Sequence, residues 1–125
     1  MTFLRIVVDT SVWIDFIAKG NDALARYLRR GRILLHPMVI GEVALGSLAR
    51  RTAVLEQLDK LPKAPVASHS NVLAMIERQS LFSRGIGYVD SHLIASARLL
   101  DGGRVWTRDK RLAEQAERLS VAFNP

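Results

Sequence analysis

Four acidic side chains in this sequence could share one chemical site. Asp9 directly follows the apolar run 4–8, and Asp109 follows a second run, 105–107, after one intervening residue. Residues that follow the strands of a parallel sheet lie at its carboxyl edge, where such folds bind their ligands. If both runs are parallel strands, the two carboxylates are expected to meet at that edge.

An N-cap role is the simpler alternative for these two acids, because Asp is favoured at helix starts. The alternative suits Asp109, since a helix is expected to begin at the next residue. It suits Asp9 less well, because Thr10 and Ser11 are themselves good caps for the helix that follows.

The other two acids, Glu42 and Asp90, lie in segments that are expected to form apolar helices. Glu42 lies in the run 38–45, which is apolar on nearly every side and has no basic residue within one helical turn. Asp90 shares a helical stripe with three apolar residues that follow it. A buried carboxylate must be paired, protonated or bound to a metal, so both are expected to face a partner. An exposed face remains open for Glu42, and an N-cap role for Asp90.

Brought together, four carboxylates would repel one another unless a cation lay among them. Such an all-oxygen set suits hard divalent ions, Mg²⁺ or Mn²⁺. A zinc cage is not expected, because the chain has no cysteine and its histidines are scattered. His92 falls nearly opposite Asp90 on its helix and is interpreted as structural or surface, whereas His36 is interpreted as a strand-end residue.

The elements that must position these acids alternate between strands and helices. Strands are expected at 4–8, 33–35, 104–107 and 121–123, with a short edge strand at 66–67. Helices are expected at 11–19, 23–30, 39–50, 52–61, 71–82, 89–100 and 110–119. This alternation predicts a parallel sheet covered on both faces. With no linker or repeat, residues 1–125 are expected to form one domain.

The composition favours a soluble protein with polyanionic partners. The chain has 18 Lys plus Arg against 12 Asp plus Glu, a net charge of +6, and 14 of the basic residues are Arg. Arginine pairs two phosphate oxygens at once, although a net charge of this size also serves solubility alone. No apolar run approaches the length of about 20 residues that spans a membrane. No secretory signal is recognisable, so a cytoplasmic location is expected.

Four motifs make the chain resemble the PIN-domain ribonucleases, and most closely the VapC toxins of toxin–antitoxin pairs. They are VDTSVWID from Val8, IGEV from Ile40, YVDSHLIASA from Tyr88 and WTRDKRL from Trp106. Each motif alone is weak, but their order and spacing between residues 6 and 115 are specific. The resemblance implies a three-layer α/β/α sandwich with a central parallel sheet. It also implies an endoribonuclease that binds Mg²⁺ or Mn²⁺ and cuts RNA with metal-activated water.

The resemblance also assigns residues. It makes four acids catalytic and metal-binding: Asp9, Glu42, Asp90 and Asp109. Three hydroxyl residues would support them: Thr10, Ser11 and Thr107. Many members share an acid at the position of Asp15, which is otherwise interpreted as a helix-surface or capping residue.

RNA must reach an acidic pocket, so a basic rim is expected. Arg108, Lys110 and Arg111 flank Asp109 in the sequence and are candidates to bind RNA. A second basic cluster either binds RNA or forms a solvated helix face; it consists of Arg26, Arg29, Arg30 and Arg32.

The resemblance implies two protein partners, a second copy in a homodimer and a VapB-like antitoxin. Apolar residues of the early helices would form either an antitoxin groove or part of the core; they are Val12, Trp13, Phe16 and Leu24.

Two other functions were weighed against the nuclease. A non-catalytic, metal-stabilised RNA-binding domain would show the same pattern of acids and bases. A receiver-like module that takes up a phosphoryl group is disfavoured, because it needs an adjacent acidic pair after the first strand, where this chain has Asp9 alone.

Overall fold

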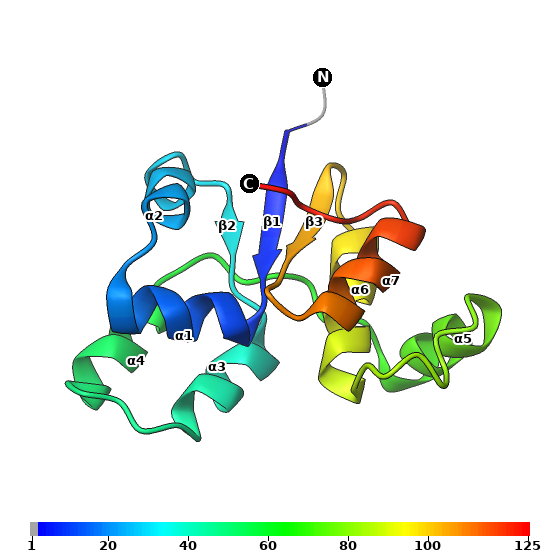
Figure 1. Ribbon diagram of the computed structural model, residues 1–125, viewed down its shortest axis with the longest axis horizontal. Coiled ribbons are helices and arrows are strands. Elements are labelled where there is room, and N and C mark those ends of the chain that lie inside the picture. The colour runs from blue at the N-terminus through cyan, green and yellow to red at the C-terminus, as the bar shows by residue number, and fades with distance from the viewer. Residues whose placement is uncertain (1–2) are drawn as a thin grey trace.

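The computed structural model describes residues 3–125 and has a three-stranded parallel sheet at its centre (Figure 1). The strands are β1 (Arg5–Val8), β2 (Ile33–Leu34) and β3 (Gly103–Trp106), in the order β2-β1-β3. The parallel sheet expected from the sequence is therefore confirmed. Its carboxyl edge brings together the residues that follow all three strands.

Seven helices surround the sheet in the described part of the chain. They are α1 (Thr10–Lys19), α2 (Asp22–Arg29), α3 (Pro37–Ala44), α4 (Arg51–Asp59), α5 (His69–Arg78), α6 (Tyr88–Arg98) and α7 (Lys110–Arg118). Helix α6 packs on β1 and β3, and α7 packs on β3, while α3 lies against α1 and α4 (Figure 1). Within residues 3–125, no helix has the length and apolar character that crossing a membrane requires.

The central strand β1 is apolar because helices cover both of its faces. Ile6, Val7 and Val8 are fully buried, and Val8 lies opposite Trp106 in the register with β3. An unbroken β-branched run of this kind is typical of a strand buried on both sides. Burial of these side chains holds the register of β1 with β3, and thereby fixes the position of Asp9 at the end of the strand.

Helix α6 approaches β3 closely because Gly103 has no side chain. A Cβ atom on Gly103 would lie 2.0 Å from the carbonyl oxygen of Ala97, which is shorter than any real contact. The seven consecutive residues Ser91–Ala97 are all buried on this helix. The close packing holds the C-terminal end of α6 on β3, and the buried run that begins at Ser91 follows directly on Asp90 in the first turn.

Two expected strands are not formed. Residues 121–123 make a single bridge, in which Val105 donates to the carbonyl of Val121 (2.7 Å) and Phe123 donates to that of Val105 (3.0 Å). The edge pairing expected at 66–67 occurs earlier, where Leu35 bridges to Lys63. The pairing stops there because Pro65, two residues after Lys63, has no N–H to donate.

Two helices are shorter than expected. The helix expected at 39–50 ends at Ala44, because Gly46 and Ser47 are poor helix formers. The guanidinium of Arg51 closes this end by donating to the carbonyl of Ala44. The helix expected at 71–82 ends at Arg78.

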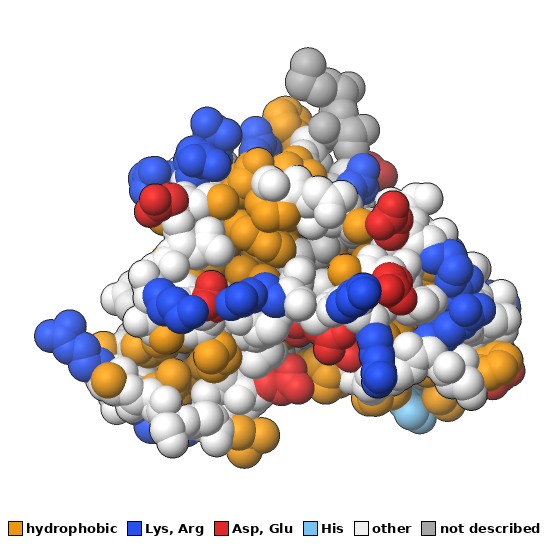
Figure 2. Space-filling model, viewed as in Figure 1, with side chains coloured by type: hydrophobic (Ala, Val, Ile, Leu, Met, Phe, Trp, Pro, Cys, Tyr) orange, Lys and Arg blue, Asp and Glu red, His pale blue; other side chains and the backbone are white. Residues whose placement is uncertain are grey.

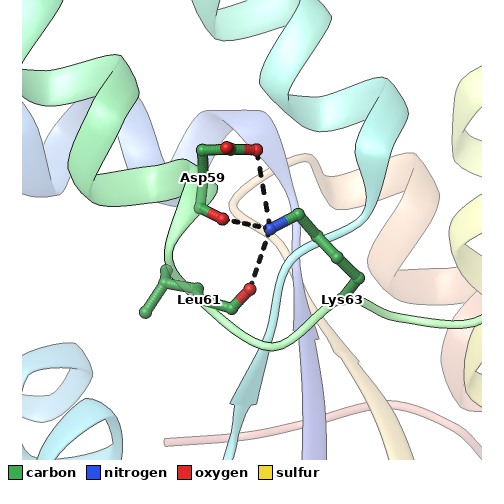
Figure 3. A network of polar contacts seen from close by, with 3 residues as sticks. All are labelled: Asp59, Leu61 and Lys63. Atoms are coloured by element: carbon green, nitrogen blue, oxygen red, sulfur yellow. Dashed lines mark hydrogen bonds and ion pairs between the residues drawn. The ribbon is translucent and has the colours of Figure 1, made fainter.

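The end of α4 is closed by a lysine from the loop that follows it (Figure 3). The ammonium group of Lys63 donates to the carbonyls of Asp59 and Leu61 and lies 3.7 Å from the Asp59 carboxylate. A cation at a helix C-terminus satisfies carbonyls that have no partner within the helix. The contact holds the loop beside the edge strand β2.

Candidate active site

Asp9 lies at the carboxyl end of β1 and is held by three hydrogen bonds. Its Oδ1 accepts from the N–H of Thr10 (2.8 Å), and its Oδ2 accepts from the hydroxyls of Ser11 (2.8 Å) and Thr107 (2.7 Å). The side chain is 6% exposed. Asp9 is therefore the N-cap of α1, the role that the sequence favoured less, and it also ties β1 to the segment after β3.

Asp109 caps α7. Its Oδ1 accepts from the N–H groups of Arg111 (2.8 Å) and Leu112 (3.1 Å), so the N-cap interpretation of this residue is confirmed. The hydroxyl of Thr107 accepts from the N–H of Asp109 (2.9 Å), which links this cap to Asp9. Within residues 3–125 the other oxygen of Asp109, Oδ2, makes no hydrogen bond and is free for a ligand.

Asp90 lies in the first turn of α6, half-buried, where its Oδ2 accepts from the N–H of Gly87 (2.9 Å). Burial raises the pKa of this carboxyl, and repulsion from Asp9, Asp109 and Glu42 raises it further, against the opposing hydrogen bond from Gly87. Repulsion from all three acids means that the four carboxylates lie within electrostatic reach of one another. We call Asp9, Glu42, Asp90 and Asp109 the acidic site.

Glu42 belongs to this site, but the expectation that it is buried is wrong. Helix α3 buries a different stripe, Val39 and Val43, and leaves Glu42 exposed. The Oε1 atom of Glu42 accepts from the hydroxyl of Thr10 (2.6 Å), which connects α3 to the start of α1. The apolar run around Glu42 includes exposed surface as well as core, since Leu45, the C-cap of α3, is 89% exposed.

Basic side chains surround the acids on one face of the molecule. Figure 2 shows acidic side chains near the middle of this face, with Lys and Arg gathered above and beside them. The guanidinium of Arg108 lies 2.7 Å from the carboxylate of Asp15. Arg111 lies over Gly85, where a Cβ atom would come within 2.6 Å of its Cδ. Lys110 is exposed at the start of α7. All three candidates for RNA contact thus flank the acidic site.

The second basic cluster lies elsewhere. Its residues follow or end α2 and precede β2, so they lie toward the amino edge of the sheet, opposite the acidic site (Figures 1 and 2). The structure therefore does not bring this cluster together with Arg108.

Two histidines near the acidic site are buried. His36 is the N-cap of α3, where its Nδ1 accepts from the N–H of Met38 (3.1 Å), so it is more than the strand-end residue expected. Its ring lies 5.8 Å from that of His92, which is 2% exposed and thus structural. Burial, aided by His92, lowers the pKa of His36 to about 4. Sequence analysis missed this cap, although a polar residue before Pro37 at a helix start was a usable signal.

The donor atoms of the acidic site suit a hard divalent cation. They are carboxylate and hydroxyl oxygens, and the pKa of Asp90 is raised by burial and, to a smaller extent, by the neighbouring acids. In the described residues, no three His, Asp or Glu side chains stand close enough together to hold a metal ion as a ready-made cluster. The site therefore fits such an ion in charge and donor type, with direct ligation by fewer than three of its carboxylates in this conformation.

An apolar groove runs between α1 and α4. Trp13, Phe16 and Ile17 line one side of it, and Val54 and Leu58 line the other. Three of the four residues proposed for a groove are core, since Val12 and Trp13 are each 1% exposed and Leu24 is 0% exposed, although Trp13 also lines this groove.

The parallel sheet with acids at its carboxyl edge defines a recognised class of domain. The family model "PIN domain" matches residues 6–118, and the chain belongs to that family. The resemblance inferred from the four motifs is thereby confirmed.

Among its relatives, the chain is similar to Ribonuclease VapC32 of Mycobacterium tuberculosis, in both strain CDC 1551 / Oshkosh and strain H37Rv. The identity is 43% over 118 residues, which cover 94% of this chain and 95% of the relative. The family resemblance to the VapC type is therefore confirmed as well. Among solved structures, PAE2754 from Pyrobaculum aerophilum has the same fold, with a TM-score of 0.64 at 17% identity over 91% of this chain and 81% of that one.

Proposed function

We propose that this protein is a Mg²⁺-dependent endoribonuclease and the toxin of a VapBC-type pair. The observation that supports it most is the placement of four carboxylates from separate elements within electrostatic reach of one another, where burial first and then repulsion from the other three acids raise the pKa of Asp90. The similarity to a protein named a ribonuclease supports RNA as the substrate. The excess of Arg in the sequence supports a polyanion as the partner.

Asp9 and Asp90 would hold the principal ion, with Glu42 and Asp109 acting directly or through water. An ion there supplies activation of a water nucleophile and neutralisation of charge on the phosphate in the transition state. Mn²⁺ would serve in the same site, since it accepts the same oxygen ligands.

Hydroxyl groups of the chain orient the carboxylates. Ser11 and Thr107 both donate to Oδ2 of Asp9, and Thr10 donates to Glu42. These bonds fix the acids before substrate arrives, which lowers the cost of assembling the site. Arg108, Lys110 and Arg111 would bind the phosphates of RNA as it enters.

The test is cleavage of total RNA by the pure protein with Mg²⁺, with Mn²⁺ and with chelator. We expect cleavage only with metal, and none from Asp9→Asn or Asp90→Asn. Asn is preferred to Ala because its side-chain oxygen can still accept the capping hydrogen bonds. Asp101→Asn, an exposed acid in the turn after α6, is the matched control and should cleave normally.

Two outcomes would overturn the proposal. Cleavage retained by either site variant would show that the acidic site is not the catalytic one. RNA binding that survives the chelator, without cleavage under any metal, would identify the non-catalytic RNA-binding domain instead.

We propose further that the groove between α1 and α4 receives an apolar segment of a VapB-like antitoxin. Its walls are apolar, and Arg50 at its rim offers a charge to an acidic residue of that segment. Co-expression with the antitoxin should yield a complex that Phe16→Asp disrupts. A homodimer in the cytoplasm is also proposed, and light scattering on purified protein would test the dimer.

A further inference from the structure

An ion pair joins two parts of the chain that are far apart in sequence. Nη1 of Arg108, just before α7, lies 2.7 Å from Oδ1 of Asp15 in the middle of α1. The Asp15 side chain is 20% exposed and that of Arg108 is 58% exposed. Lys19 also lies 3.5 Å from Asp15, one helical turn along α1.

This ion pair is not needed to hold the two segments together. The backbone N–H of Arg108 already donates to the Ser11 hydroxyl (3.0 Å), and the N–H of Asp9 donates to the carbonyl of Trp106 (2.8 Å). An ion pair with a largely exposed partner contributes little to stability. Its main effect is to fix where the guanidinium of Arg108 points.

The pairing leaves most of the guanidinium available. A guanidinium has five N–H donors, and the ion pair with Asp15 is made through Nη1 of Arg108. The remaining donors can bind two oxygens of a phosphate at once. Asp15 lies six residues beyond Asp9 on α1, a rise of about 9 Å, so a phosphate bound by Arg108 would lie about that far along the helix from the acidic site.

We propose that Asp15 is a positioning residue that holds Arg108 as a clamp for one phosphate of the RNA backbone, and so sets which phosphodiester reaches the acidic site. The inference rests on the proposed function, since it assumes that RNA is the substrate. It assigns Asp15 to substrate placement rather than to ion binding.

The experiment separates binding from cleavage. RNA affinity is measured by fluorescence anisotropy in an Asp90→Asn background with a short oligonucleotide spanning a site cut in total RNA. We expect Arg108→Ala to weaken binding about tenfold or more and to reduce the slope of log affinity against log salt by about 1. Asp15→Asn should weaken binding about three- to tenfold while keeping most of the salt slope, because Arg108 is still present.

The pairing is tested by combining the changes. In the Arg108→Ala protein, Asp15→Asn should have almost no further effect, whereas additive losses would overturn the proposal. In the otherwise wild-type protein, Asp15→Asn should raise KM and leave kcat within about twofold. The matched control is Asp22→Asn, an exposed acid at the start of α2, which should bind RNA like the parent.

A purely structural role for Asp15 would give a different result. The melting temperature of Asp15→Asn would then fall while its RNA affinity stayed unchanged, which would overturn the clamp. Failure of the proposed function is recognised separately, because the wild-type protein would then not cut RNA under any metal. Unchanged binding in Arg108→Ala, beside normal wild-type cleavage, would reject the clamp alone.

Discussion

The hydroxyl of Thr107 donates a 2.7 Å hydrogen bond to Oδ2 of Asp9, although 98 positions separate the two residues in the sequence. The same oxygen of Thr107 accepts from the N–H of Asp109. One hydroxyl therefore joins the acid that follows β1 to the acid that caps α7. This link aligns two of the four carboxylates of the acidic site.

Replacing this hydroxyl should loosen the site. Thr107→Val keeps the shape of the side chain but removes both bonds and leaves the N–H of Asp109 without its partner. We expect a loss of about 1–3 kcal/mol in the free energy of unfolding, measured by urea denaturation, together with reduced cleavage. Thr107→Ser should restore both properties, and equal losses in Val and Ser variants would contradict the assigned role.

Asp90→Asn should stabilise the protein while abolishing its activity. Because the pKa of Asp90 is raised in the folded state, its ionisation opposes folding at neutral pH. The variant should therefore melt at a higher temperature than wild type at pH 7. The difference should shrink as the pH falls toward the ordinary value of 3.8, and below that pH the wild-type carboxyl is protonated in both states.

The same pair of proteins reports on ion binding. Mg²⁺ should raise the melting temperature of the wild-type protein, because a ligand that binds only the folded state stabilises it. Mg²⁺ should have a much smaller effect on the melting temperature of Asp90→Asn.

For the pH prediction, a melting temperature at pH 7 that is lower in the variant than in the wild-type protein would contradict the raised pKa of Asp90.

His36 should make the protein sensitive to mild acid. Its pKa of about 4 lies below the ordinary 6.5, so the unfolded chain binds the proton more tightly. The contribution of neutral His36 to the free energy of unfolding is fully present above pH 6.5 and falls as the pH drops toward 4. The free energy of unfolding should decrease by about 2 kcal/mol between pH 7 and pH 5. Protonation would also break the cap, because Nδ1 could no longer accept from Met38.

The measurement is urea unfolding at pH 7 and pH 5. His36→Asn is the control, because Asn caps helices but does not titrate. It should lose less stability between the two pH values than the wild-type protein. An identical loss in both would mean that other groups cause the acid sensitivity.

Two glycines should respond to alanine in opposite directions. Gly103→Ala would drive a methyl group into the Ala97 carbonyl and should cost about 3 kcal/mol of stability. Gly41→Ala, in the interior of α3, meets nothing within 4 Å. It should raise stability by about 0.5–1 kcal/mol, because alanine loses less backbone entropy. Both shifts are measured by thermal and urea denaturation, and a stabilised Gly103→Ala would contradict the close approach of α6 to β3.

The strands and most helices could be predicted because their signals are local. The apolar runs that became β1 and β3 are signals of this kind. The sheet edges could not be predicted, because pairing at Lys63 rather than at 66–67 depends on which loop reaches Leu35.

The sequence could nominate the four acids but could not predict the geometry in which they lie. Position after a strand was enough to nominate Asp9 and Asp109. The exposure of Glu42 depends on which stripe of α3 meets the core, and an all-apolar helix does not reveal this. The pairing of Asp15 with Arg108 joins residues 93 positions apart, and neither residue's neighbours in sequence indicate the other.

The way the acids are held has a consequence for spectroscopy. Asp9 accepts from the N–H of Thr10, Asp90 from that of Gly87, and Asp109 from those of Arg111 and Leu112. Each of these amide hydrogens points at a carboxylate of the acidic site. The chemical shifts of these four amide hydrogens should move together when a diamagnetic ion enters the acidic site. An NMR titration of the protein therefore has four reporters of ion binding and needs no label beyond ¹⁵N.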